Sequence, residues 1–141
     1  MAGYSGTPLV QKLGIKAGYN VAFVNAPPEF VQELDLPPGV KTNLRSKKRF
    51  DFVHLFTMSE KDLQARFSQW AAKLAPAGML WVSWPKKSSG VETDLSENVV
   101  REIGLRTGLV DVKICAVDEV WSGLKFVIRV KDRPKALDPK A

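Results

Sequence analysis

The residues most able to bind a charged ligand form a short polar segment that directly follows an apolar one. Residues 79–85 read Met-Leu-Trp-Val-Ser-Trp-Pro, which predicts a strand buried on both faces, as in a parallel sheet. The polar segment after it consists of Lys86, Lys87, Ser88, Ser89 and Gly90. Ammonium groups, hydroxyls and backbone N–H groups bind anions, but the spacing is not that of a P-loop. The segment is therefore either an anion site or an ordinary exposed turn.

Polar and aromatic residues also follow the other predicted strands. In a doubly wound sheet the carboxyl ends of the strands meet at one edge, and ligands bind there. Lysines would supply charge, hydroxyls and the asparagine amide would supply hydrogen bonds, and tryptophan could stack on a ring. The candidate ligand-binding residues are Asn25, Pro27, Thr57, Trp84, Lys86, Lys87, Ser88, Ser89, Asp118, Trp121 and Ser122. Trp121 could instead pack against the edge of its own hairpin.

No set of residues forms a recognisable catalytic centre, and none is predicted to bind a metal. His54 is the only histidine and lies inside an apolar strand, so we expect a buried structural side chain rather than a base. Cys115 is the only cysteine, and its apolar surroundings favour a structural thiol. Asp118 and Glu119 are adjacent, and strand alternation would direct them to opposite faces, so a paired-carboxylate site is not expected.

The elements that must position these residues alternate between helices and strands. We expect helices beginning near Thr7, Phe30, Ser59 and Asp94 or Ser96, and strands over 20–25, 51–57, 79–85, 110–117 and 124–130, with a weaker strand over 40–44. The third helix would bury Leu63, Phe67, Trp70, Ala71 and Leu74 and end at Pro76-Ala77-Gly78, and the fourth would bury Val99, Val100, Ile103 and Leu105. The pattern predicts an α/β, Rossmann-like, three-layer fold with a mostly parallel sheet and a C-terminal antiparallel hairpin.

Length, charge and composition limit the class of protein. The 141 residues suffice for one domain, which we place at 1–130, followed by a flexible basic tail at 131–141. No apolar run approaches the roughly 20 residues of a membrane span, no signal peptide is evident, and a single cysteine fits a reducing cytoplasm. The net charge of +6 is concentrated in residues 41–49 and in the tail. Basic residues that could bind nucleic acid weakly are Lys41, Arg45, Lys47, Lys48 and Arg49, although the composition favours a solvated loop.

Three features resemble the class I methyltransferase fold in a shortened form. Asp51-Phe52-Val53-His54 is similar to the central strand that follows the cofactor motifs of that fold. Leu74-Ala75-Pro76-Ala77-Gly78 resembles the turn before its fifth strand, and the final hairpin resembles its last two strands. The resemblance covers about residues 7–130. It implies a site at the carboxyl edge of the sheet.

The first predicted turn departs from the methyltransferase pattern. Methyltransferases have a glycine-rich turn there, whereas this chain has Val24-Asn25-Ala26-Pro27-Pro28-Glu29. The two prolines lack N–H donors and stiffen the backbone. We therefore expect no bound cofactor, and predict a non-catalytic module that binds a small anionic ligand or a macromolecule at the carboxyl edge. The alternatives are a divergent S-adenosylmethionine-dependent methyltransferase and a weak nucleic-acid-binding protein.

Longer motifs resemble a small bacterial family of unknown function, domain of unknown function 3052. These are residues 4–9 (Tyr-Ser-Gly-Thr-Pro-Leu), residues 80–90 (Leu-Trp-Val-Ser-Trp-Pro-Lys-Lys-Ser-Ser-Gly) and residues 117–125 (Val-Asp-Glu-Val-Trp-Ser-Gly-Leu-Lys). The resemblance spans nearly the whole chain. It implies no known activity, substrate or catalytic residue.

Overall fold

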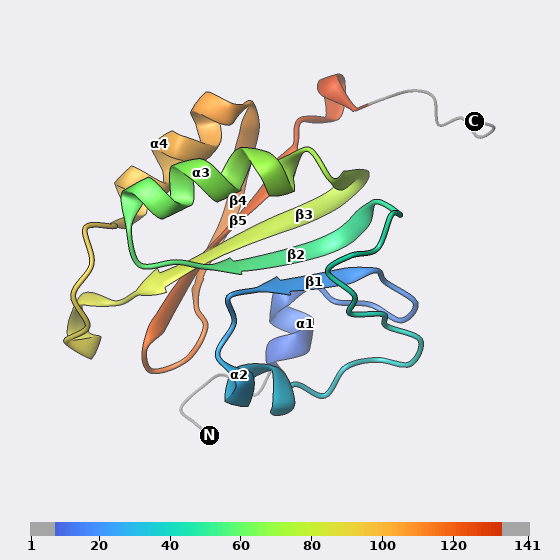
Figure 1. The fold of residues 1–141 in the computed structure, drawn as a ribbon, viewed down its shortest axis with the longest axis horizontal. Helices are drawn as coiled ribbons and strands as arrows, with labels where there is room; N and C mark the ends of the chain where they lie inside the picture. The colour runs from blue at the N-terminus through green and yellow to red at the C-terminus, as the bar shows by residue number, and fades with distance from the viewer. Residues whose placement is uncertain (1–7, 134–141) are drawn as a thin grey trace.

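The computed structural model describes residues 8–133, which form four α-helices and one five-stranded sheet (Figure 1). The helices are α1 (Leu9–Leu13), α2 (Pro28–Gln32), α3 (Glu60–Ala71) and α4 (Glu97–Thr107). The strands are β1 (Val21–Val24), β2 (Phe50–Phe56), β3 (Leu74–Pro85), β4 (Leu109–Ala116) and β5 (Trp121–Ile128). Short 3₁₀ turns cover Lys87–Ser89 and Val130–Asp132.

The sheet has the strand order β1-β2-β3-β5-β4. β1, β2 and β3 are mutually parallel, whereas β5 is antiparallel to both β3 and β4. The predicted α/β class and the C-terminal antiparallel pair are confirmed. The last strand of the chain thus lies inside the sheet, between two strands made earlier.

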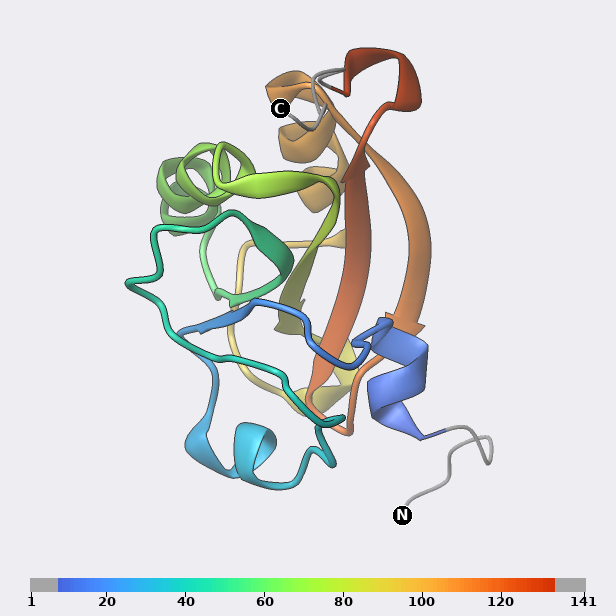
Figure 2. The same ribbon diagram turned by 90° about the vertical axis from the view of Figure 1, so that its right-hand side faces the viewer.

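Helices cover both faces of the sheet and give three layers, as predicted (Figure 2). On one face α3 and α4 pack over apolar side chains that include Phe67, Trp84 and Phe126. On the other face the shorter α1 and α2 enclose a core that includes Phe30, Phe56 and Trp81. Because β2 and β3 contribute to both cores, their sequences are apolar almost throughout, which is typical of strands buried on two sides.

The two long helices begin at serine caps. Ser59 Oγ accepts a hydrogen bond from the Asp62 N–H at 3.1 Å, as predicted, and Ser96 Oγ accepts one from the Val99 N–H at 3.3 Å. Asp94 does not cap its own helix. Its Oδ1 accepts from the backbone N–H of Glu60 at 2.8 Å and so joins the starts of α3 and α4.

Gly104 lets α4 lie directly on the sheet. A Cβ at this position would lie 2.1 Å from Cε1 of Phe126 in β5, well inside van der Waals contact. Phe126 is fully buried and packs edge-to-face on Phe67 of α3, with ring centroids 5.1 Å apart. A single close contact therefore connects both helices with β5.

On the opposite face α1 is fixed to the central strand by one buried hydrogen bond. The indole Nε1–H of Trp81 donates to the carbonyl of Leu13, the last residue of α1, over 2.9 Å. Gly14 then ends the helix with a φ of 93°, a left-handed conformation that glycine adopts without a Cβ penalty. The first helix is thus tied to the sheet from its carboxyl end.

Five local predictions are wrong or fall outside the described residues. Residues 40–44 form no strand, and only an isolated parallel bridge joins Lys41 to Asn20. Leu105 is 40% exposed and does not face the core. α3 ends at Ala71, and the segment expected to stop it belongs to β3, which begins at Leu74. The predicted cap Thr7, and the tail beyond Arg133, lie outside the described residues.

Candidate functional site

Four segments meet at the carboxyl edge of the parallel strands, as the sequence predicts. Residues 25–28 follow β1, residues 57–59 follow β2 and residues 86–90 follow β3. The turn at 118–120 joins them because β3 and β5 are antiparallel and pair Pro85 with Trp121. The Lys86 N–H also donates to the Val120 carbonyl over 2.7 Å.

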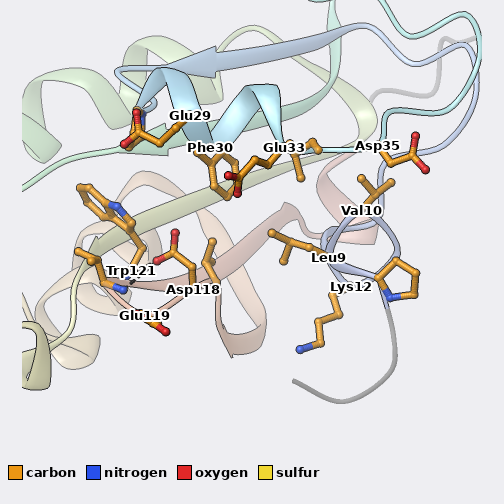
Figure 3. A pocket seen from close by; sticks show the side chains of 15 residues that line it. Leu9, Val10, Lys12, Glu29, Phe30, Glu33, Asp35, Asp118, Glu119 and Trp121 are labelled. Atoms are coloured by element: carbon orange, nitrogen blue, oxygen red, sulfur yellow. Dashed lines mark hydrogen bonds between the residues drawn. The ribbon is translucent and has the colours of Figure 1, made fainter. Parts of the chain in front are cut away.

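A hollow at this edge lies between α1, α2 and the β4–β5 turn (Figure 3). We call it the acidic groove, and its volume is about 700 Å³. Its lining comes from residues 8–10 and 12, from 27, 29–30 and 33–35, and from 117–121. Three segments distant in sequence therefore build it, and the candidate residues predicted from the sequence include Pro27, Asp118 and Trp121 of its lining.

The groove combines apolar side chains with carboxylates. Val10, Phe30 and Val117 are buried and contribute apolar surface, and Trp121 is half-buried beside them. The charged side chains of the lining are Glu29, Glu33, Asp35, Asp118, Glu119 and Lys12. Five acids against one base are unexpected in a protein of net charge +6. The electrostatic character of the groove is thus opposite to that of the whole chain.

Asp118 shapes the turn that carries Trp121. Its Oδ1 accepts hydrogen bonds from the backbone N–H groups of Val120 at 2.9 Å and Trp121 at 2.8 Å, an Asx-type turn. The Val117 N–H closes the turn by donating to the Trp121 carbonyl at 2.9 Å. The Trp121 ring then meets Phe56 edge-to-face, with centroids 5.0 Å apart. Asp118 therefore has a positioning role in addition to its charge.

A second hollow lies beside the acidic groove and shares Pro27 and Trp121 with it. Its volume is about 630 Å³, and residues 25–28 and 56–59 line it with Asp62. Asn25 has a φ of 59°, so the turn after β1 uses an asparagine in the left-handed conformation where methyltransferases have glycine. Pro27 and Pro28 then offer no N–H groups to a ligand.

Two polar side chains of this second hollow, Thr57 and Asp62, already bind each other. The Thr57 hydroxyl donates to Asp62 Oδ2 over 2.7 Å, and Arg66 Nε donates to Asp62 Oδ1 over 2.8 Å. Burial alone would raise the pKa of Asp62, but the hydrogen bonds from Arg66 and Thr57 outweigh this effect and lower it. Asp62 is therefore an ionised, partnered group and a poor general base.

His54 and Cys115 lie where the sequence predicts, inside strands. His54 is fully buried, its Nε2 lies 2.7 Å from Ser83 Oγ, and its Nδ1 has no partner among the described residues. Burial lowers the pKa of His54 to about 3, so the ring is neutral at physiological pH. Burial also raises the pKa of the Cys115 thiol, which stays protonated and is a poor nucleophile.

The remaining candidate residues lie outside both hollows. Trp84 is buried against α3 and α4, on the opposite face of the sheet, and Ser122 pairs with it from β5. Lys87 and Ser88 are exposed, and Ser89 Oγ donates to the Lys86 carbonyl within its own 3₁₀ turn. The structure thus brings together Asn25, Pro27, Thr57, Asp118 and Trp121, and leaves Trp84, Lys86, Lys87, Ser88, Ser89 and Ser122 outside the two cavities.

The basic segment lies at the opposite, amino end of the strands. Residues 46–50 and 72–73 line a shallow hollow of about 380 Å³ there. Arg49 is not available as a simple surface charge, because its guanidinium donates to the carbonyls of Ala72 at 2.8 Å and Leu74 at 3.2 Å. The first of these carbonyls is one that the end of α3 leaves open, and the second belongs to the first residue of β3.

Residues 8–133 contain no group of three or more histidine, cysteine, aspartate or glutamate side chains arranged to hold a metal ion. Within the same range no helix has the length and apolarity to cross a membrane.

The fold is that of class I S-adenosylmethionine-dependent methyltransferases. No family model matches the chain, and no curated protein matches it in sequence. Solved structures do: a TehB-like methyltransferase from Corynebacterium glutamicum aligns with a TM-score of 0.57 and 10% identity, over 86% of this chain and 85% of the other. Magnesium protoporphyrin IX methyltransferase from Synechocystis PCC 6803, solved with bound SAM, aligns with a TM-score of 0.56 and 11% identity. The alignment covers 85% of this chain and 74% of that enzyme.

An O-methyltransferase from neocarzinostatin biosynthesis reaches a TM-score of 0.60 at 11% identity, over 79% of this chain but 49% of that enzyme. At such low identities the likeness establishes the fold alone. The predicted methyltransferase-like architecture is thereby confirmed, and the activity of these enzymes does not transfer with it.

Proposed function

We propose that this protein is a non-catalytic, methyltransferase-like module that binds a small ligand at the carboxyl edge of its sheet, in the acidic groove. The observation that carries the proposal is the turn after β1. It keeps the place of a cofactor-binding turn but contains Asn25, Pro27 and Pro28 in place of glycines, so two of its backbone positions offer no N–H to a nucleotide.

The titratable groups near this edge support a binding role rather than a catalytic one. Thr57 and Asp62 are bonded to each other, and the His54 ring is neutral and buried. A general base needs an accessible group whose pKa lies near the working pH, and neither Asp62 nor His54 meets this condition. The acidic groove, in contrast, has the size and the mixed apolar and polar lining of a small-molecule site.

A fragment screen followed by ¹H–¹⁵N NMR tests the proposal. We expect bound fragments to shift the amides of residues 117–121 and 29–34, and we expect Trp121→Leu to remove these shifts. Leu105→Ala, an exposed residue of α4, is the matched control and should retain them. Fragments that bind only elsewhere, or no fragment binding at all, would contradict a ligand site in the groove.

The second candidate function is that of a divergent methyltransferase. The likeness to enzymes solved with SAM favours it, as does the hollow beside Asn25, which lies directly after β1. This candidate requires S-adenosylhomocysteine to bind with measurable heat, and binding to weaken in Asn25→Leu. Calorimetry without heat at millimolar ligand would exclude it for practical purposes.

The predicted anion site at Lys86 and Lys87 and the predicted nucleic-acid contact at residues 41–49 are separate proposals. Both depend on basic side chains outside the two cavities at the carboxyl edge, of which Lys86 is half-buried and Lys87 is exposed. A phosphate titration that shifts the amides of residues 86–90 would support the first. For the second, affinity for duplex DNA should fall steeply as salt rises, and retention that is independent of salt would argue against it.

A further inference from the structure

The acidic groove carries a charge that no side chain of the described chain neutralises by an ion pair. The ion pairs of residues 8–133 join Arg66 to Asp62, Arg101 to Glu97 and Asp111, and Arg106 to Glu102. All of them lie on α3, α4 and β4, and none includes an acid of the groove. Within residues 8–133 the acids of the groove are therefore open to solvent or a ligand, as are acids outside it such as Glu92.

Two of these acids approach the groove from opposite walls. Glu33, just after α2, and Asp118, in the β4–β5 turn, point toward the space between them, whereas the carboxylates of Asp35 and Glu119 point away from it (Figure 3). Asp118 uses Oδ1 to hold the Val120 and Trp121 N–H groups. Its Oδ2 makes no hydrogen bond to a described residue and can accept one from a ligand.

Apolar surface lies directly beside this pair of carboxylates. Trp121 and Phe30 both line the groove, and both rings pack edge-to-face on Phe56, with centroids 5.0 and 5.1 Å away. The rings are therefore fixed in orientation before any ligand arrives. An aromatic face next to a carboxylate attracts cations through the ring quadrupole as well as through charge.

We propose that the acidic groove binds a small organic cation that has an apolar body, with the cation between Glu33 and Asp118 and the body against Trp121 and Phe30. This inference rests on the proposed ligand-binding function and names the chemical class of the ligand. An anion would face five carboxylates against one lysine. A volume of about 700 Å³ suits a small molecule.

The test uses three probes of similar shape and different charge, tryptamine, tryptophol and indole-3-propionate, titrated into the ¹⁵N-labelled full chain at low salt. Shifts of the Trp121 indole N–H and of the Val120 and Trp121 amides report binding in the groove. We expect tryptamine to bind about fivefold more tightly than tryptophol, the ratio that a partly exposed ion pair supplies, and indole-3-propionate to bind more weakly than either.

Variants that remove one charge each locate the origin of the preference. Asp118→Asn keeps the Oδ1 acceptor that holds the turn, and Glu33→Gln changes an exposed side chain outside the core, so both should fold. Each should reduce the preference for tryptamine over tryptophol. Glu92→Gln, an exposed acid of the loop after β3, removes the same charge outside the groove and should leave the preference unchanged.

The outcomes separate the two proposals. Three results would overturn the cation site while leaving ligand binding in the groove intact. They are equal affinity of all three probes at Trp121, tighter binding of indole-3-propionate than of tryptamine, and a preference for tryptamine that survives both Asp118→Asn and Glu33→Gln. If none of the probes moves these signals at millimolar concentration, both proposals fail.

Discussion

Lowering the pH from 7 to 5 should destabilise this protein through a single side chain, His54. The ring is fully buried, stacks on Phe56 with centroids 4.2 Å apart and meets Phe30 edge-on. Burial alone lowers its pKa to about 3, because no charged group offsets the loss of water. In an unfolded chain the same ring titrates near 6.5.

The sign and the size of the effect follow from these two pKa values. Between pH 6.5 and about 3 the unfolded chain binds a proton that the folded protein does not, so the free energy of unfolding falls as the pH falls. The stability is fully present above pH 6.5. From pH 7 to pH 5 the loss is about 2 kcal/mol for an unfolded pKa of about 6.5, and its slope approaches about 1.4 kcal/mol per pH unit.

Urea denaturation at pH 7, 6 and 5 measures this loss, which corresponds to a fall of about 1 M in the midpoint. His54→Leu should abolish the pH dependence in this range, whatever it does to stability at pH 7. Ser83→Ala removes the hydrogen-bond partner but keeps the imidazole, so it should retain the dependence. A flat wild-type profile, or a His54→Leu variant with an unchanged slope, would refute the reasoning.

Three further predictions concern stability at pH 7. Gly104→Ala should lower the free energy of unfolding by about 2–3 kcal/mol, because the new Cβ would overlap the Phe126 ring. The matched Leu105→Ala on the same helix should lower it by less than about 1 kcal/mol. Equal losses for the two variants in urea denaturation would contradict the close contact. Arg49→Met should lower the free energy of unfolding by about 1–2 kcal/mol, because it leaves the carbonyls of Ala72 and Leu74 without their donor. A denaturation curve like that of the wild type would show that the two hydrogen bonds contribute nothing to stability. Ser59→Ala should lower the free energy of unfolding by about 1 kcal/mol, because α3 loses its cap. Ser59→Asp keeps a capping oxygen and should retain most of the wild-type stability. An equal loss of stability in both variants would argue against capping.

Much of the fold could be predicted because its strongest signals are local. The apolar runs that became β2 and β3 bury both faces, and such runs mark central parallel strands wherever they occur. Ser59 stands three residues before Asp62, which is enough to place the start of α3.

The errors arise where tertiary contacts override the local pattern. Residues 40–44 were expected to form a strand, yet only Lys41 bonds to the edge of the sheet, where it accepts from the Val21 N–H and donates to the Tyr19 carbonyl. The chain then turns at residues 43–46, where the Ser46 N–H donates to the Asn43 carbonyl. Leu105 has the spacing of a core residue, but α4 turns it toward solvent while Gly104 meets the sheet. Pro76 lies in a strand because a register shift beside Phe50 accommodates the start of β3.

The candidate site was predictable in part for the same reason. Asn25, Thr57 and Asp118 follow strands, so strand order alone gathers them at one edge. Phe30 and Glu33 were missed, because their place in the groove depends on how the short α2 folds under the sheet. The one available signal was the helical spacing of Phe30, Val31 and Leu34, which marks an apolar face but does not say what lies opposite.

The position of β5 has a consequence for synthesis of the chain. A nascent polypeptide that ends before Trp121 already contains α1–α4 and β1–β4, but the strand that should separate β3 from β4 is still missing. The edges of β3 and β4 that face β5 would then present open backbone donors and acceptors. The fully buried Trp81 and Val82 of β3 would also lack their strand partners Lys125 and Leu124. Completion of the sheet must wait for the final strand to emerge from the ribosome, so premature termination would leave a species prone to aggregate.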